Sequence, residues 1–270
     1  VADDTAAIQA AINAAATAGK SLYIPAGIYD VTTLYFYYDA SNNTGYPSGT
    51  RIQGRMIVQG EGCSNRTNHT WIDYQAGTLI NCTSTTADGL KFGNASNSVS
   101  MHVRDIAVWG DTSGTLVDLD YLPQYSHFRD LFIGNRGSGT ALKLRSIWAS
   151  LFENIDLQGE PSTGVQGKGI WFDNEGTSGT PTIGGGLNTF INITTSYFAT
   201  GQQWHNVYQA SGTGSRVNTF IGLQSRRCTQ GINFYHGFNC EVTGLWTEHN
   251  TSYAVKIAET ASDITLNNVQ

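Results

Sequence analysis

Carboxylate side chains are the residues of this 270-residue chain best suited to catalysis, and the candidates are Asp156, Asp173, Glu175 and Glu248. Glycoside hydrolysis requires two carboxyl groups, one kept protonated as an acid and one acting as base or nucleophile. The two groups stand about 5 Å or roughly 6.5 to 9.5 Å apart, according to the stereochemistry. Two of these residues could therefore serve as the acid and the base of such a reaction, although an Arg, Lys, Tyr or His base would leave elimination open.

Aromatic and polar side chains around Glu248 are suited to binding a sugar. Sugar sites combine flat aromatic faces with hydrogen-bonding groups. The residues of this kind that we expect to contact substrate are Trp246, Gln224, Arg226, Arg227, Tyr208 and Tyr235. Glu248 itself is open to two interpretations, a catalytic acid or one half of an ion pair with Arg226.

Charge and composition exclude several other partners. The chain has 15 Lys and Arg against 21 Asp and Glu, a formal net charge of −6, and its basic residues are scattered, which argues against nucleic acid. No apolar run is long enough to span a bilayer, so we expect no membrane partner. No CxxC motif or Cys/His cluster is present, so we expect neither a metal nor another cofactor. We expect the cysteines to be free and buried.

One short pattern recurs from residue 99 onward: an apolar residue, any residue, then Asn, Asp or Gly, then an apolar residue that begins a strand. The copies end at Ile106, Leu131, Ile155, Ile193, Leu223, Leu245 and Val269. The period is near 24 residues with two enlarged turns, too short for a βαβ unit. We expect the Asn and Asp side chains to form a ladder that bonds the backbone of their own turn or of the next coil.

A second alternating strand follows most copies, with apolar residues facing inward, as at Val117 and Leu119. The leucine-rich repeat alternative lacks its Leu-x-x-Leu-x-Leu spacing. The sequence therefore predicts an all-β fold, a single-stranded parallel β-helix in which successive coils stack in parallel.

Stacking at about 4.8 Å places equivalent outward residues in columns. The first strand gives the columns Phe132, Asp156, Thr194, Gln224, Trp246 and Gln158, Ser196, Arg226, Glu248. The second strand gives Asp120, Arg145 and Asp173, either a catalytic pair about 10 Å apart or a ladder of alternating charge. The enlarged turn between Ile155 and Ile193, which carries Asp156, Glu160, Asp173 and Glu175, is expected to overhang a sugar groove or to be a solvated loop.

An amphipathic helix is predicted over residues 4–18, with Asp4 as N-cap, Ile8 and Ile12 on one face, and Gly19 as the stop. A stacked-coil fold leaves the apolar end of its core open, and this helix is suited to cap it. We expect residues 1–30 to form the capping helix and first strand and residues 31–270 to form the β-helix.

The segments Asp3–Ile12 and Leu22–Tyr29, followed by Ile57–Gly62, resemble the N-terminal signature of the pectate-lyase superfamily. The resemblance covers nearly the whole chain and implies a right-handed helix. Within this superfamily, the chain most resembles bacteriophage tailspike depolymerases, which are trimers that digest bacterial capsule, exopolysaccharide or O-antigen. The chain begins just after the usual Gly-Asp-Gly of that family and stops within a recurring strand, so we expect it to be a fragment of a longer protein.

The pectinolytic branches fit less well. The Asn-Thr-Asp, Gly-His-Gly and Arg-Ile-Lys motifs of polygalacturonases are missing, and Trp71–Tyr74 lacks the His of the pectate-lyase Trp-Ile-Asp-His. The resemblance therefore implies a homotrimeric tailspike-type depolymerase of a virion tail, acting on a bacterial surface polysaccharide, with hydrolysis favoured over elimination. The alternatives are a non-catalytic glycan-binding adhesin and a secreted pectinolytic enzyme.

Overall fold

The structure is a computed structural model that describes residues 3–39, 44–45, 56–62, 77–93, 100–122, 125–160, 166–173, 186–205, 218–236, 240–257 and 264–270. Helix α1 spans Thr5–Ala18. The first sheet contains β1 (Leu22–Tyr23), β2 (Gly27–Val31), β6 (Met56–Gln59), β7 (Thr78–Cys82), β9 (Met101–Gly110), β11 (His127–Asn135), β13 (Leu151–Gln158), β15 (Thr189–Ser196), β17 (Asn218–Arg226), β19 (Cys240–Glu248) and β21 (Ile264–Val269). The second contains β3 (Leu34–Tyr35), β8 (Leu90–Phe92), β10 (Thr115–Asp120), β12 (Thr140–Arg145), β14 (Gln166–Asp173), β16 (Phe198–His205), β18 (Gln230–His236) and β20 (Tyr253–Ile257). Strands β4 (Tyr38–Asp39) and β5 (Thr44–Gly45) form a small antiparallel pair.

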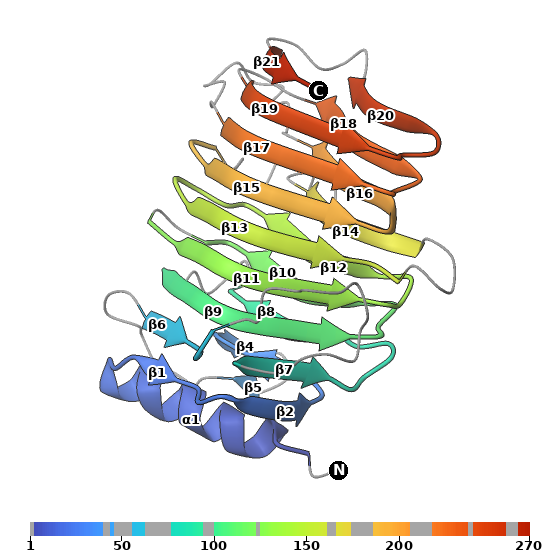
Figure 1. The fold of residues 1–270 in the computed structure, drawn as a ribbon. Coiled ribbons are helices and arrows are strands. Elements are labelled where there is room, and N and C mark those ends of the chain that lie inside the picture. The colour runs from blue at the N-terminus through green and yellow to red at the C-terminus, as the bar shows by residue number, and fades with distance from the viewer. Residues whose placement is uncertain are drawn as a thin grey trace.

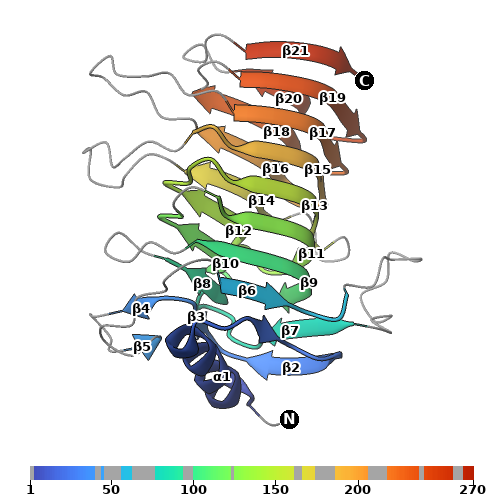
Figure 2. The same ribbon diagram turned by 90° about the vertical axis from the view of Figure 1, so that its left-hand side faces the viewer.

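From β8 onward the chain alternates between the two large sheets, so that one strand of each sheet makes up one coil of a solenoid (Figure 1). Each strand of these sheets pairs in parallel with the equivalent strand of the neighbouring coil, for example β11 with β9 and β13. Figure 2, turned by 90°, shows the coils stacked from the N-terminal helix to the C-terminal strand. The fold is a right-handed parallel β-helix, which confirms the predicted fold class.

All seven copies of the short motif lie in register in the first sheet. Ile106 pairs with Leu131, Leu131 with Ile155, and Ile155 with Ile193. The pairing continues through Ile193 with Leu223 and ends at Leu245 with Val269. The repeat in the sequence is therefore the repeat of the stack, because each coil contributes one motif copy to the first sheet.

The third residue of each motif forms a corner within a continuous strand, not a turn before the strand as the sequence predicted. These residues have left-handed backbones with φ between 52° and 71°: Asp105, Asp130, Asn154, Asn192, Gly222, Gly244 and Asn268. Gly, Asn and Asp tolerate this conformation best, which explains why only they occupy the position. The corner bends the first sheet, so β9 pairs with β6 before it and with β7 after it.

The predicted ladder at this corner exists, but its bonds join side chain to side chain instead of side chain to backbone. The amide of Asn154 donates to Asp130 Oδ1, and that of Asn192 donates to Asn154 Oδ1, both at 3.0 Å. At the next coil, a Cβ on Gly222 would stand 2.7 Å from Asn192 Oδ1. Repeated spacing of about 4.8 Å lets one carboxyl or amide reach the next directly.

A column of phenylalanines fills the core behind these corners. Phe128, Phe152, Phe190 and Phe220 stack with ring centroids 4.9 to 5.4 Å apart and planes within 12° of parallel. All four are buried. Aromatic pairs at such separations add to the apolar area removed from water, so this column ties successive coils together.

Helix α1 lies across the N-terminal end of the stack (Figure 1). Its apolar face, Ile8, Ile12, Ala15 and Ala16, belongs to the buried core. Gly19 ends the helix in a left-handed conformation with φ 61°, as predicted. Asp4 stands at the N-cap, and its carboxylate accepts a hydrogen bond from the Asp30 amide instead of capping the helix. None of the described helical structure has the length and apolar character that a membrane crossing requires.

Three of the four cysteines, Cys82, Cys228 and Cys240, are free and buried, and Cys63 lies outside the described residues. Burial raises the pKa of the Cys82 thiol to about 12, so this thiol stays protonated at neutral pH. These residues act as small apolar side chains in the core.

Candidate functional site

The outer face of the first sheet carries the two predicted columns. Register pairs Asp156 with Thr194, Thr194 with Gln224, and Gln224 with Trp246. The parallel column pairs Ser196 with Arg226 and Arg226 with Glu248. The register of both columns is confirmed, but Gln158, which begins the second column and was expected to face outward, is fully buried.

Glu248 is half of an ion pair. Its Oε2 lies 3.2 Å from Arg226 Nε, and its Oε1 lies 3.3 Å from His249 Nε2. The Arg226 guanidinium carbon also stands 5.1 Å from the centroid of the Trp246 ring, within cation–π range. Trp246 is 40% exposed, so part of its side chain is accessible to a ligand.

The other predicted residues are dispersed. Arg227 turns away from Glu248 and donates from Nη1 to the Tyr197 hydroxyl at 2.6 Å. Asp173 and Tyr235 lie in β14 and β18 of the second sheet. Glu175 and Tyr208 lie outside the described residues.

Distance keeps Asp156 and Glu248 apart. They belong to β13 and β19, three strand spacings or about 14 Å apart, beyond the range of a glycosidase pair. Asp173 is on the other sheet. The structure therefore does not bring Asp156, Asp173 and Glu248 together within one chain, and their catalytic role stays a prediction.

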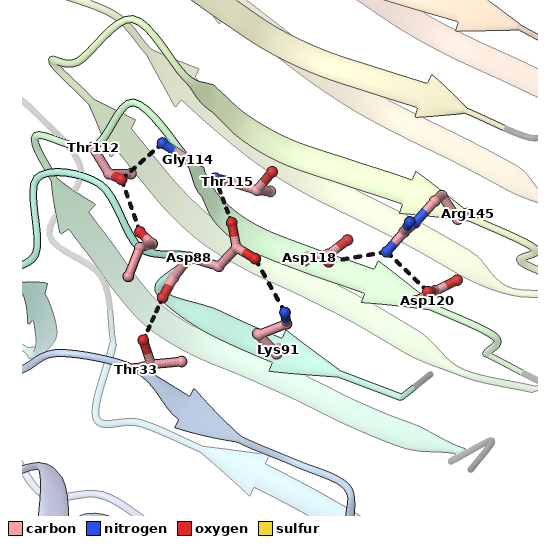
Figure 3. Close-up of polar contacts among 10 residues, drawn as sticks. Thr33, Asp88, Lys91, Thr112, Gly114, Thr115, Asp118, Asp120 and Arg145 are labelled. Atoms are coloured by element: carbon pink, nitrogen blue, oxygen red, sulfur yellow. Dashed lines mark hydrogen bonds and ion pairs between the residues drawn. The ribbon is translucent and has the colours of Figure 1, made fainter. Parts of the chain in front are cut away.

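A closer carboxylate pair lies on the outer face of the second sheet. In β10, Val117 and Leu119 point into the core, so the alternating Asp118 and Asp120 point outward. Both contact Arg145 of the neighbouring β12, whose Nη2 lies 3.2 Å from Asp118 Oδ2 and 2.9 Å from Asp120 Oδ2 (Figure 3). Two oxygens that share one nitrogen at these distances can be at most about 6 Å apart.

Both carboxylates of this pair are largely withdrawn from water. The exposed fraction is 7% for the Asp118 side chain, 13% for that of Asp120, and 34% for that of Arg145. Asp118 Oδ1, Asp120 Oδ1 and Arg145 Nε are buried and have no hydrogen-bond partner among the described residues. Such unpartnered buried polar atoms are costly, and a water molecule or a ligand could supply the missing hydrogen bonds.

Burial dominates the electrostatics of the pair. Desolvation raises the pKa of Asp120 to about 6, against the opposing effect of Arg145 and with a further increase from Asp118. The pKa of Asp118 is raised for the same first reason, desolvation, again opposed by Arg145. Two carboxyls that share one cation titrate as a unit, so the pair holds a proton under mildly acidic conditions.

The surroundings of the pair are polar. Asp88 Oδ1 accepts a hydrogen bond from the Thr115 amide at 2.8 Å, and its Oδ2 lies 3.1 Å from Lys91 Nζ (Figure 3). Two coils beyond Asp118, Trp171 has the ammonium groups of Lys143 and Lys168 at 4.1 and 3.9 Å from its ring centroid. The flank therefore combines carboxylates, cations and an aromatic ring, as a sugar site requires.

The predicted column of Asp120 and Arg145 is confirmed by their register pairing. Asp118 is not among the residues that the sequence predicts for the site. The available signal was the Asp118-x-Asp120 alternation, which puts two acids on one face of a strand. Among the described residues, no group of three or more His, Cys, Asp or Glu side chains is arranged to hold a metal ion.

Comparison with known proteins identifies the fold. No protein-family model matches the sequence, and neither does any curated protein sequence. Two solved structures share the architecture. One is the ORF18 protein of Geobacillus virus E2, with a TM-score of 0.53 and 15% sequence identity. The alignment covers 99% of this chain and 58% of ORF18.

The second is WceF of Pantoea stewartii, described as a glycan biofilm modifying enzyme with a bacteriophage tailspike-like parallel β-helix fold. Here the TM-score is 0.55 and the identity 15%, and the alignment covers 98% of this chain but only 36% of WceF. The chain thus shares the parallel β-helix fold of these two proteins and spans 58% of the length of the first and 36% of the second.

Proposed function

We propose that this protein is a tailspike-type depolymerase that hydrolyses glycosidic bonds of a bacterial surface polysaccharide, with Asp118 and Asp120 as the catalytic pair. The observation that carries the proposal is the pair itself: two outward carboxyls, at most about 6 Å apart, buried against one arginine. Most glycoside hydrolases need one protonated and one ionised carboxyl, and two buried carboxyls that face one arginine can share a single proton.

Asp120 acts as the general acid because its raised pKa keeps it protonated in mildly acidic solution. It donates its proton to the glycosidic oxygen of the leaving sugar while ionised Asp118, held by Arg145, attacks the anomeric carbon. Water then cleaves the glycosyl–Asp118 ester, with Asp120 taking the water's proton. The short separation favours this retaining course, which needs about 5 to 5.5 Å, over the wider inverting arrangement.

The tailspike part of the proposal is supported by the shared fold. WceF is described as a glycan-modifying enzyme with a tailspike-like fold, and ORF18 is a virus protein. We extend this to a homotrimer on a virion tail, with the polysaccharide lying along the flank of the β-helix. The outward residues Trp246, Gln224 and Arg226 would then bind further sugar units on the first sheet.

The experiment compares the wild type with Asp120→Asn on a panel of bacterial capsular polysaccharides and O-antigens, measuring new reducing ends. Asparagine keeps the size of the side chain but cannot donate the carboxyl proton, so kcat should fall at least about 100-fold. Glu241→Gln, which neutralises an exposed carboxylate on β19, is the matched control and should retain full activity. Equal activity of Asp120→Asn and wild type would exclude the proposed acid.

A second candidate is a non-catalytic glycan-binding module, favoured by the half-exposed Trp246 with Arg226 against its ring. In that case a polysaccharide would be retained by the protein and never shortened. Trp246→Ala would abolish retention, whereas Asp120→Asn would leave it unchanged. Detection of any shortened product that requires Asp120 would decide against this candidate.

A further inference from the structure

A second polar site lies where the chain crosses from the first sheet to the second. It is a groove of about 540 Å³, within the range of small-ligand sites, and its lining includes Asp111, Ser113, Arg136, Ser138, Glu160 and Gln166. None of these residues belongs to the carboxylate pair. Three successive coils contribute to the groove, through the β9–β10, β11–β12 and β13–β14 connections.

Register stacks the three charged residues of the groove. Gly110 pairs with Asn135, and Gly134 pairs with Gln158, so Asp111, Arg136 and Glu160 follow at equivalent positions on successive coils. Asp111 and Glu160 therefore stand two spacings or about 10 Å apart, with Arg136 between them. Arg136 Nη2 lies 3.8 Å from Asp111 Oδ2, with side chains 44% and 55% exposed.

That exposed ion pair contributes little to stability, typically no more than about 1 kcal/mol. Both groups are accessible to solvent, so a ligand can take the place of Asp111 as the partner of Arg136, or of Arg136 as the partner of Asp111, with little loss of stability. Glu160 differs, because it is only 7% exposed and thus holds a fixed position in the wall.

Hydrogen bonds and close packing hold the backbone of the groove at Gly137 in place before any ligand binds. Asn135 Oδ1 accepts hydrogen bonds from the amides of Thr112 and Gly137 at 3.1 and 3.0 Å. Gly137 packs so closely that an added Cβ would stand 2.3 Å from the Thr112 carbonyl oxygen. A preorganised site loses less conformational entropy on binding, which favours affinity.

The donors and acceptors of the groove complement a neutral sugar ring. Two carboxylates accept hydrogen bonds from ring hydroxyls, the guanidinium donates to them, and the hydroxyls of Ser113 and Ser138 do either. The three charged side chains sum to −1, which disfavours a uronate at this position. Ser113 and Asp118 are five residues apart, so about 16 Å of chain separates the groove from the carboxylate pair on the same coil.

We propose that this groove, formed around Asp111, Arg136 and Glu160, is a separate subsite that binds a neutral hexose unit of the polysaccharide, away from the position of cleavage. The inference rests on the proposed function, because it takes the ligand to be a polysaccharide. It adds a recognition site that contacts the chain but not the reacting bond.

The test measures binding separately from cleavage, in the Asp120→Asn background, by affinity electrophoresis in gels containing purified neutral or uronate-bearing capsular polysaccharides. At least one neutral polysaccharide should retard the protein. Arg136→Gln and Glu160→Gln should each raise its dissociation constant about 5-fold or more, while the control Glu241→Gln should leave it unchanged. In otherwise wild-type enzyme the same two variants should raise KM with kcat preserved.

Retardation by uronate-bearing polysaccharides alone, or equal dissociation constants with and without Arg136→Gln and Glu160→Gln, would overturn the subsite. The failure of the proposed function has a different signature. A neutral polysaccharide would then bind in an Arg136- and Glu160-dependent way, yet the wild type would never shorten it.

Discussion

Asp118 and Asp120 lie side by side on one strand, and both are almost fully buried. Two buried carboxylates destabilise a fold unless a cation or a proton compensates them. Arg145 provides one positive charge for the two acids, so a proton on Asp120 completes the neutralisation. At the residue scale, burial of the two carboxyls both raises their pKa values and lowers the stability of the fold.

The raised pKa of Asp120 predicts how stability depends on pH. Since the pKa of Asp120 rises from its ordinary value of 3.8 to about 6 on folding, the folded state binds more protons than the unfolded state between these values. The contribution of Asp120 to stability must therefore fall as pH rises through this window. We expect Asp120→Asn to remove about 1 to 3 kcal/mol of that fall, measured by urea unfolding from pH 4 to pH 7.

Glu241→Gln serves as the control here as well, because its carboxylate is exposed on β19 and the fall in stability should persist in that variant. An identical pH dependence in Asp120→Asn and wild type would show that Asp120 is ionised throughout.

At the scale of the element, the left-handed corner of each first-sheet strand is the feature that repeats most faithfully. Asn192 adopts φ 54° and donates its side-chain amide to Asn154 at 3.0 Å. The conformation costs an ordinary L-residue roughly 1 to 2 kcal/mol more than glycine, and an exposed hydrogen bond contributes about 0.5 to 1 kcal/mol.

These magnitudes predict a ranking of two variants. Asn192→Ala should lower the free energy of unfolding by about 1 to 2 kcal/mol. Alanine cannot form the hydrogen bond, and it tolerates the left-handed backbone conformation less well than asparagine does. Asn192→Gly loses only the hydrogen bond and should cost less than about 1 kcal/mol. Denaturant unfolding of the two proteins measures the difference. A glycine variant less stable than the alanine variant would contradict this account of the corner.

At the scale of the whole molecule, periodicity made the fold predictable. The seven motif copies prescribe a strand and a corner per coil, and their register follows from stacking equivalent apolar residues, as from Ile106 to Val269. Gln202 shows the limit of the pattern. It is fully buried at the position that Ile170 and Ile232 occupy in neighbouring coils, because its amide donates to the Gln224 carbonyl at 2.8 Å.

The site was predictable only in part. Columns such as Gln224 with Trp246 follow from the register alone. The burial of the outward Asp118 does not, because alternation indicates which side of a strand a residue faces and not whether that side is covered. Nor does the pattern show which acid an arginine contacts, and Arg145 contacts two.

The proposed homotrimer is a prediction at the molecular scale. Ile221 is 42% exposed on β17 and pairs with Ile191 of β15, and these neighbouring apolar side chains are a candidate for contact between copies. Sedimentation equilibrium should give three times the mass of one chain, and Ile221→Asp should shift the distribution toward single chains without loss of the circular dichroism of β-structure. A single-chain mass for the wild type would contradict the assembly.

The central claim is that the Asp118–Asp120 pair hydrolyses a glycosidic bond, and the masses of the products test it most directly. A susceptible polysaccharide incubated with wild-type protein should give oligosaccharides whose masses equal the repeating units plus one water, and Asp120→Asn should give none. Unsaturated products without the added water, or the same hydrolysis products from Asp120→Asn, would contradict the claim.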